Sequence, residues 1–330
     1  MNQLRLNKLE EEPYKFTIME REEILKKIDA KYEELGIPTE AMLEGLLYGK
    51  PMVYWDYVQT DALLGLQTQR TTFPDEMVFI MYHQINELLF KMILHEIQQV
   101  SKADSISTEK FAKHLMRISR YFDMLSSSFD IMGDGMDKEQ FLQFRNTLTP
   151  ASGFQSAQYR MVEMASTELI NLIDIRFRAT IDRDTPFEHA YEHLYWQAAG
   201  KNYNTGQKST LLNTFEKKYM GDFIDFMKDY NTINLSMKFK SLPEVDRKNV
   251  DLVNAMRHYD HTVNVKWVMA HYHAAAKYIG DGAATGGSDW TKYMLPRYQK
   301  RIFFPELWSE EEKENWGITN LESYKVLTEV

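Results

Sequence analysis

Residues 149–160 combine a loop, a predicted helix start and an arginine, and they are the first place in the chain where chemistry can be expected. Ser152 and Gln155 have the spacing of a capping box, so we expect a helix to begin near Gly153 and Arg160 to lie on its second turn. The planar guanidinium and the positive end of the helix dipole both favour an anion there. The pattern therefore predicts a carboxylate site, and an ordinary structural ion pair of Arg160 is the alternative.

A histidine stands among aromatic side chains in the long apolar stretch 72–100, which opens with Phe, Pro and two acidic residues as helices often do. Steps of four and three residues place Phe79, His83, Glu87 and Phe90 on one stripe of this helix. An imidazole in that position can bind a ligand, or it can be a buried histidine that only bonds a neighbour.

A second histidine lies near the end of the longest helix that the sequence predicts. This helix starts near Pro243 and meets no breaker before Gly280, which allows up to about 37 residues and about 55 Å unless it is kinked. His271 shares a face with small and aromatic side chains: Trp267, Ala274, Ala275 and Tyr278. The alanines leave room for a flat cofactor, although they would also permit close helix packing.

Composition limits the classes of function. The 330 residues are 44% hydrophobic and 13% aromatic, enough for a buried core. A net charge of −9 argues against binding to nucleic acid or to an anionic membrane. The absence of cysteine excludes disulfides, thiolate metal sites and thiolate-ligated haem, so histidine and carboxylates remain as metal ligands. No apolar run has the length of a signal peptide core or a membrane span, so we expect a cytoplasmic protein.

The remaining stretches also have helical patterns. Residues 1–16 are charged and aperiodic and are predicted to be a mobile arm, and 17–330 are predicted to form one helical domain with an insertion or subdomain at 164–240. Within 164–240 we expect loops near 182–186 and 199–206. Further helices are expected at 20–35, 41–47, 108–129 and 137–149.

Other histidines offer alternative metal sites. His189 and His193 stand one helical turn apart, as in a zinc pair, but the glutamate of the H-E-x-x-H motif and a third ligand are missing. His258, His261 and His273 are rivals of His271 for a metal.

Three motifs, in the same order along the chain, resemble those of the tryptophan 2,3-dioxygenase family. Residues 149–160 resemble its SPASGFQS-x-Q-x-R motif, and residues 75–91 resemble its DE-x-x-F-x-x-x-HQ-x-x-EL-x-x-K helix. Residues 267–288 resemble its W-x-x-x-H, I-G and TGGS series, with the family's step of fourteen residues between His271 and Thr285. The resemblance covers the chain from about Tyr54 to the C-terminal region.

The resemblance implies an all-α fold, a helical bundle with long core helices around a haem pocket, in a homotetramer. Haem b, active in its Fe²⁺ form, would have His271 as its axial iron ligand and Trp267 as a neighbouring contact. His83 would be the catalytic residue facing the indole N–H. The substrate contacts implied are Phe79, His83, Arg160 and Thr285, with Tyr54, Tyr57 and Val58 supplied by a neighbouring subunit.

The activity implied is cleavage of the indole C2–C3 bond of L-tryptophan by dioxygen, giving N-formylkynurenine. In that arrangement Arg160 and Thr285 would fix the amino-acid end of the substrate and so orient its ring. Two alternatives stay open: a relative that inserts one oxygen atom into an indole or another aromatic amino acid, and a non-catalytic helical scaffold that binds a ligand.

Overall fold

The computed structural model describes residues 19–148, 155–279 and 295–318. Within these ranges the chain forms α-helices and short 3₁₀ and π segments, with extended pairing limited to the isolated bridges Ile173–Leu194 and Lys201–Lys208. The predicted all-α class is therefore confirmed. None of the helices in these ranges combines the length and the apolar character needed to span a bilayer.

The chain divides into two compact units, residues 1–66 and 67–330. The described part of the first unit holds α1 (Arg21–Glu34), α2 (Thr39–Tyr48), α3 (Tyr54–Val58) and α4 (Thr60–Leu64). The arm expected at residues 1–16 lies outside the described residues. The single domain expected from residue 17 stays a prediction.

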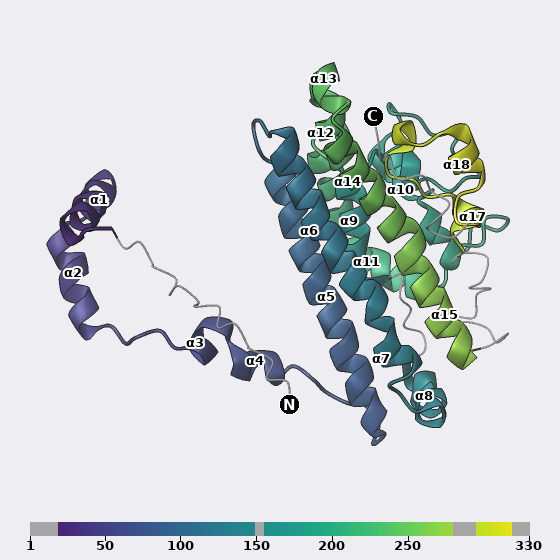
Figure 1. Ribbon diagram of the computed structural model, residues 1–330. Coiled ribbons are helices and arrows are strands. Elements are labelled where there is room, and N and C mark those ends of the chain that lie inside the picture. The colour runs from purple at the N-terminus through teal and green to yellow at the C-terminus, as the bar shows by residue number, and fades with distance from the viewer. Residues whose placement is uncertain (1–18, 149–154, 280–294, 319–330) are drawn as a thin grey trace, which may run out of the picture. The chain divides into compact units, whose positions relative to one another are not determined.

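Three long runs of helix form the centre of the second unit and lie side by side: α5 (Pro74–Ser101), α6 (Thr108–Ser127) and the pair α14 (Val250–His261) and α15 (Trp267–Ile279) (Figure 1). Proline at the first position of α5 suits a helix start, because proline has no amide hydrogen to leave unpaired. Apolar residues at steps of three and four then bury one face of each helix. Those with no exposed surface include Ile93, Ile97, Leu115, Ile118 and Phe122.

The helix predicted to run unbroken from Pro243 to Gly280 is divided, which corrects the sequence-based expectation. A short helix α13 (Glu244–Arg247) comes first, and Asn249 then starts α14 by accepting a hydrogen bond from the amide of Leu252. Between α14 and α15 the chain makes a π-helical turn at Thr262–Lys266. Single π turns often occur at functional sites, and this one directly precedes Trp267 and His271.

The helix that carries Arg160 also begins later than expected. It is α9 (Ala157–Ser166), and its N-cap is Ser156, whose hydroxyl accepts a hydrogen bond from the amide of Tyr159 at 3.3 Å. The capping box predicted at Ser152 lies outside the described residues. Arg160 is therefore the fourth residue of its helix, where the second turn begins.

The other elements of the second unit complete one core. Aromatic residues of the segment 164–240, such as Tyr191, Phe215 and Phe223, belong to the same buried cluster as α5, α6 and α14. The α-helices are α7 (Phe129–Gly133), α8 (Lys138–Phe144), α10 (Phe187–Tyr191), α11 (Thr210–Tyr230), α12 (Leu235–Ser241), α17 (Pro296–Gln299) and α18 (Glu310–Glu314), and the 3₁₀ segments are Arg145–Leu148, Leu169–Leu172, Tyr195–Ala199 and Pro305–Leu307.

Candidate active site

His83 is held on α5 in one tautomer. Its Nδ1 lies 2.7 Å from the carbonyl oxygen of Phe79, one turn earlier, and its ring packs on the Phe79 ring with 4.1 Å between centroids. Because a carbonyl can only accept, Nδ1 carries the hydrogen and Nε2 is left as an acceptor in the neutral ring. The side chain reaches solvent, yet the atoms packed around it lower its pKa by desolvation. His83 is therefore a neutral hydrogen-bond acceptor at physiological pH.

His271 lies on α15 with its ring stacked on that of Phe129 from α7, at 5.1 Å between centroids and 10° between planes. Burial, with a smaller contribution from nearby His83, lowers the pKa of His271 to about 4. No described residue forms a hydrogen bond with either of its ring nitrogens. The side chain is thus a neutral imidazole with an unprotonated nitrogen available, as a metal ligand requires.

One aromatic cluster joins the two histidines. Tyr82 is next to His83, with 5.3 Å between ring centroids, and is 5.9 Å from Phe129, which stacks on His271. We call these residues, together with Phe79, the aromatic cluster. Because α7 packs on both α5 and α15, stretches far apart in the sequence bring both predicted histidines to the same place.

The residues around His271 fit a bound haem. Ala270 and Ala274, one residue before and three after it, are only partly buried against the surrounding apolar side chains and add little bulk to the helix face. Trp267 Nε1 is buried and has no hydrogen-bond partner among the described residues, although buried indole N–H groups usually have one. A neutral imidazole and an unpaired buried donor in apolar surroundings suit a large, mostly apolar cofactor with a few polar groups.

The structure gives less support to the other histidines as metal ligands. His258 and His273 are exposed, and His261 is packed against Trp316 away from the aromatic cluster. His189 and His193 lie 4.7 Å apart between ring centroids, but His193 directs Nδ1 to the His189 carbonyl oxygen. Across the described ranges, three or more histidines and carboxylates do not gather anywhere as a metal-binding group.

Arg160 is 5% exposed and already holds an ion pair. Its Nη1 lies 2.9 Å from Oε2 of Glu163, one turn later on α9, and donates a hydrogen bond to the Tyr195 hydroxyl at 2.7 Å. The guanidinium also lies over the Tyr159 ring, 4.5 Å from its centroid. Sequence reasoning did not identify Glu163, although its spacing of three residues from Arg160 on one helix is the signal that could have found it.

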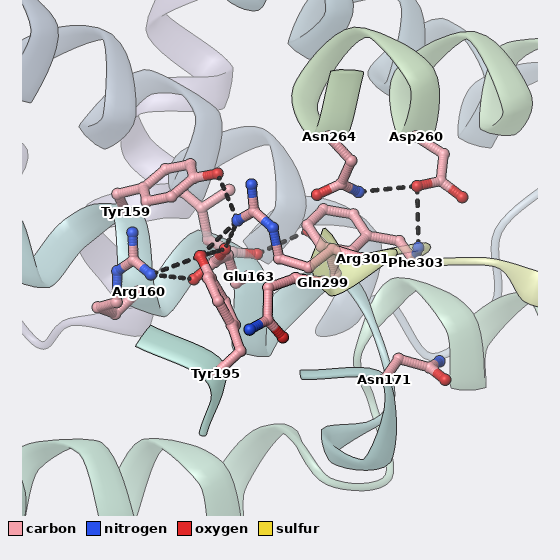
Figure 2. A network of polar contacts seen from close by, with 12 residues as sticks. Tyr159, Arg160, Glu163, Asn171, Tyr195, Asp260, Asn264, Gln299, Arg301 and Phe303 are labelled. Carbon is pink, nitrogen blue, oxygen red and sulfur yellow. Dashed lines mark hydrogen bonds and ion pairs between the residues drawn. The ribbon is translucent and has the colours of Figure 1, made fainter. Parts of the chain in front are cut away.

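A second arginine reaches the same place from the C-terminal part of the chain. Figure 2 shows Arg301 directed at Tyr159, Glu163 and Tyr195, and its Nη1 donates to all three, at 3.2 Å to the Tyr159 hydroxyl. Tyr195 in turn donates to Oε1 of Glu163 at 2.6 Å. Arg301 was not predicted, because no local pattern around it differs from that of a surface arginine.

The structure describes only some of the other predicted substrate contacts. Thr285 lies outside the described residues. Tyr54, Tyr57 and Val58 form part of α3 in the first unit, where they are exposed by 72%, 74% and 39%. Their part in the site stays a prediction.

Comparison with known proteins shows what the chain resembles. Residues 45–198 match the family model described as Tryptophan 2,3-dioxygenase. The protein of that name from a Ruegeria species is 29% identical over 278 residues, which cover 79% of this chain and 92% of the relative. The one from Bacillus cereus is 28% identical over 294 residues, covering 84% and 95%, and the one from Bacillus anthracis is 29% identical over 290 residues, also covering 84% and 95%.

The described helices define an all-helical protein, and two neutral histidines beside aromatic side chains form its candidate site. The comparisons show which proteins it resembles: the chain is an enzyme that is similar over most of its length to proteins named Tryptophan 2,3-dioxygenase.

Proposed function

We propose that this enzyme cleaves the indole C2–C3 bond of L-tryptophan with dioxygen at a haem held by His271, giving N-formylkynurenine. The observation that carries the proposal is the placement of two neutral imidazoles, His83 and His271, at one aromatic cluster. His271 has unengaged ring nitrogens for iron, and His83 has a defined acceptor for an indole N–H. The tryptophan 2,3-dioxygenases that the chain resembles support the choice of substrate.

Haem b, when bound, supplies the ferrous iron at which dioxygen is activated. The protein's own part begins with His271, whose lowered pKa keeps a nitrogen free of its proton, so that this nitrogen would be available to hold the iron. Trp267, one turn before it, has a buried N–H that would be able to donate to a polar group of the cofactor. The stacked Phe129 ring restricts the orientation of the imidazole.

His83 and Phe79 orient the substrate ring. With Nδ1–H committed to the Phe79 carbonyl, Nε2 of His83 accepts a hydrogen bond from the indole N–H, and the Phe79 ring packs against the indole. His83 holds the N–H and need not remove its proton, so it is a positioning contact to the substrate rather than an obligatory base. Fixing the ring in this way presents C2 and C3 in one orientation.

Arg160 and Thr285 hold the amino-acid end of the substrate in this proposal, Arg160 at the carboxylate and Thr285 near the ammonium. We further propose a homotetramer in which Tyr54, Tyr57 and Val58 of a neighbouring copy complete the pocket. Their exposure in the first unit supports this, because large exposed apolar side chains often mark interaction surfaces.

The proposal is tested by the haem spectrum and tryptophan turnover of two matched variants. His271→Ala should purify without a Soret band and without activity, whereas His273→Ala, an exposed histidine two residues later, should keep both. A normal Soret band in His271→Ala would refute the assignment of the iron ligand.

The carboxylate contact has its own test. Arg160→Leu should lose about 2–5 kcal/mol of apparent binding free energy for L-tryptophan, as expected when a buried charge loses its partner. Tryptamine, which has no carboxylate, should distinguish little between the two proteins. Normal tryptophan turnover by Arg160→Leu would exclude this role.

A further inference from the structure

The carboxylate of Glu163 is shared by two arginines. Oε2 pairs with Nη1 of Arg160 at 2.9 Å, and Oε1 pairs with Nη1 of Arg301. Tyr159 and Tyr195 complete the group by hydrogen bonding to the guanidinium groups (Figure 2). We call these five residues the arginine cluster.

The arginine cluster carries one positive charge in excess. It holds two guanidinium groups and one carboxylate, and both tyrosines are neutral because burial raises their pKa. Every member is at least nine-tenths buried: Glu163 is 1% exposed, Arg160 5% and Arg301 8%, with Tyr159 at 3% and Tyr195 at 8%. Glu163 is the one carboxylate among the described residues that pairs with either arginine.

An uncompensated buried charge is costly, and a fold retains one most readily where a ligand of opposite charge binds. A free donor points to the same conclusion, since Arg160 Nε is buried and has no hydrogen-bond partner among the described residues. Guanidinium groups prefer planar oxyanions such as carboxylate. The arginine cluster therefore has both the charge and the unused hydrogen-bonding capacity to accept one further carboxylate.

The arginine cluster also adjoins the aromatic cluster. The ring of Tyr159 lies 4.7 Å from that of Trp267, which is 6.3 Å from the ring of His271. An amino acid whose ring occupies the aromatic cluster would thus have an excess positive charge nearby.

We propose that the arginine cluster is a carboxylate-recognition unit in which Arg301 and Glu163 are positioning residues for Arg160 and set the substrate selectivity of the enzyme. Glu163 fixes the position of the Arg160 guanidinium. Arg301 adds a second positive charge, so the carboxylate of Glu163 does not cancel the positive charge that is available to a ligand. Without Arg301, Arg160 and Glu163 would form a neutral pair with no need for a further anion. This inference rests on the proposed function and adds two residues that determine which ligands are bound.

The test is calorimetric titration of the ferric holoenzyme with L-tryptophan and with tryptamine, which differ by the carboxylate. Arg301→Met should weaken L-tryptophan binding about 10-fold to 100-fold while tryptamine changes by less than about 3-fold. Arg301→Lys, which keeps the charge but not the fork of donors, should recover part of the loss. Glu163→Gln keeps a side-chain oxygen that can accept from Arg160 and so retains its positioning, but it removes the negative charge, so the preference for L-tryptophan over tryptamine should rise instead of fall.

The opposite directions expected for Arg301→Met and Glu163→Gln distinguish recognition from a purely structural role. A structural role predicts that both variants weaken the two ligands by the same factor, and that result would overturn the inference alone. If the unaltered holoenzyme binds neither indole, the proposed function itself is wrong.

Discussion

The imidazoles of His83 and His271 lie close enough for the charge of one to lower the pKa of the other, although their helices are far apart in the chain. Both rings are neutral at physiological pH, and they differ in what their nitrogens do. His83 has one nitrogen committed to a backbone carbonyl, and His271 has neither committed among the described residues. This difference is the basis on which we propose substrate contact for His83 and iron ligation for His271.

The hydrogen bond assigned to His83 gives a prediction that depends on the substrate. His83→Ala should lower kcat/KM for L-tryptophan by about 5-fold to 30-fold, the effect of one hydrogen bond worth about 1–2 kcal/mol. With 1-methyl-L-tryptophan, which has no indole N–H, the variant and the unaltered enzyme should differ little. Steady-state kinetics with both substrates measures the two ratios.

Complete loss of tryptophan turnover in His83→Ala, with normal haem content, would instead show that His83 is an essential acid or base. Equal losses with both substrates would show that the ring packs on the indole without accepting from its N–H.

Helical periodicity was enough to select the two histidines, because the residues that share a stripe with each of them come from the same helix. The steps through Phe79 and His83 on α5 and through Trp267 and His271 on α15 are local patterns, and the structure brings both to the aromatic cluster. The π turn at Thr262–Lys266 was not predicted, since it depends on buried tertiary contacts rather than on a helix-breaking residue. Arg301 was missed for the same reason, because its partners come from α9 and from the 3₁₀ segment at Tyr195.

Asp260 should be among the most sensitive positions for stability. It is fully buried and accepts hydrogen bonds from the amides of Phe303 and Phe304, from Trp308 Nε1 and from the side chain of Asn264. Asp260→Ala would leave these donors unpaired and should lower the free energy of unfolding by about 3–5 kcal/mol. Chemical denaturation measures the loss.

Asp251, which is exposed in the first turn of the same helix, provides the matched control. Asp251→Ala should cost less than about 1 kcal/mol, the usual size of a helix-dipole contribution. Similar losses in the two variants would mean that the hydrogen bonds of Asp260 do not hold the segment that carries Arg301.

His261 should make the fold sensitive to acid. Burial, and then repulsion by His258 and Lys266, lowers its pKa from 6.5 to about 4. Between these values the unfolded chain binds a proton that the folded protein does not, so stability falls as the pH falls from 6.5 towards 4. His261→Gln should remove this part of the acid sensitivity, worth about 3 kcal/mol near pH 4. Urea denaturation at a series of pH values measures it.

Asp260 has the opposite effect on stability over an overlapping pH range. Burial raises its pKa to about 6, so its contribution to the free energy of unfolding falls as the pH rises. The difference between the unaltered protein and His261→Gln isolates the histidine, since Asp260 is present in both. The exposed His95 on α5, replaced by glutamine, is the control. Parallel stability curves for the unaltered protein and His261→Gln would contradict the prediction.

The central claim is that both atoms of dioxygen enter one molecule of tryptophan. The haem-loaded enzyme is reduced without oxygen, then given L-tryptophan and ¹⁸O-labelled dioxygen, and the product is analysed by mass spectrometry. We predict N-formylkynurenine that contains two ¹⁸O atoms. A product with a single ¹⁸O atom would identify a monooxygenase, and the absence of any oxidised product from a haem-loaded, reduced enzyme would contradict the account.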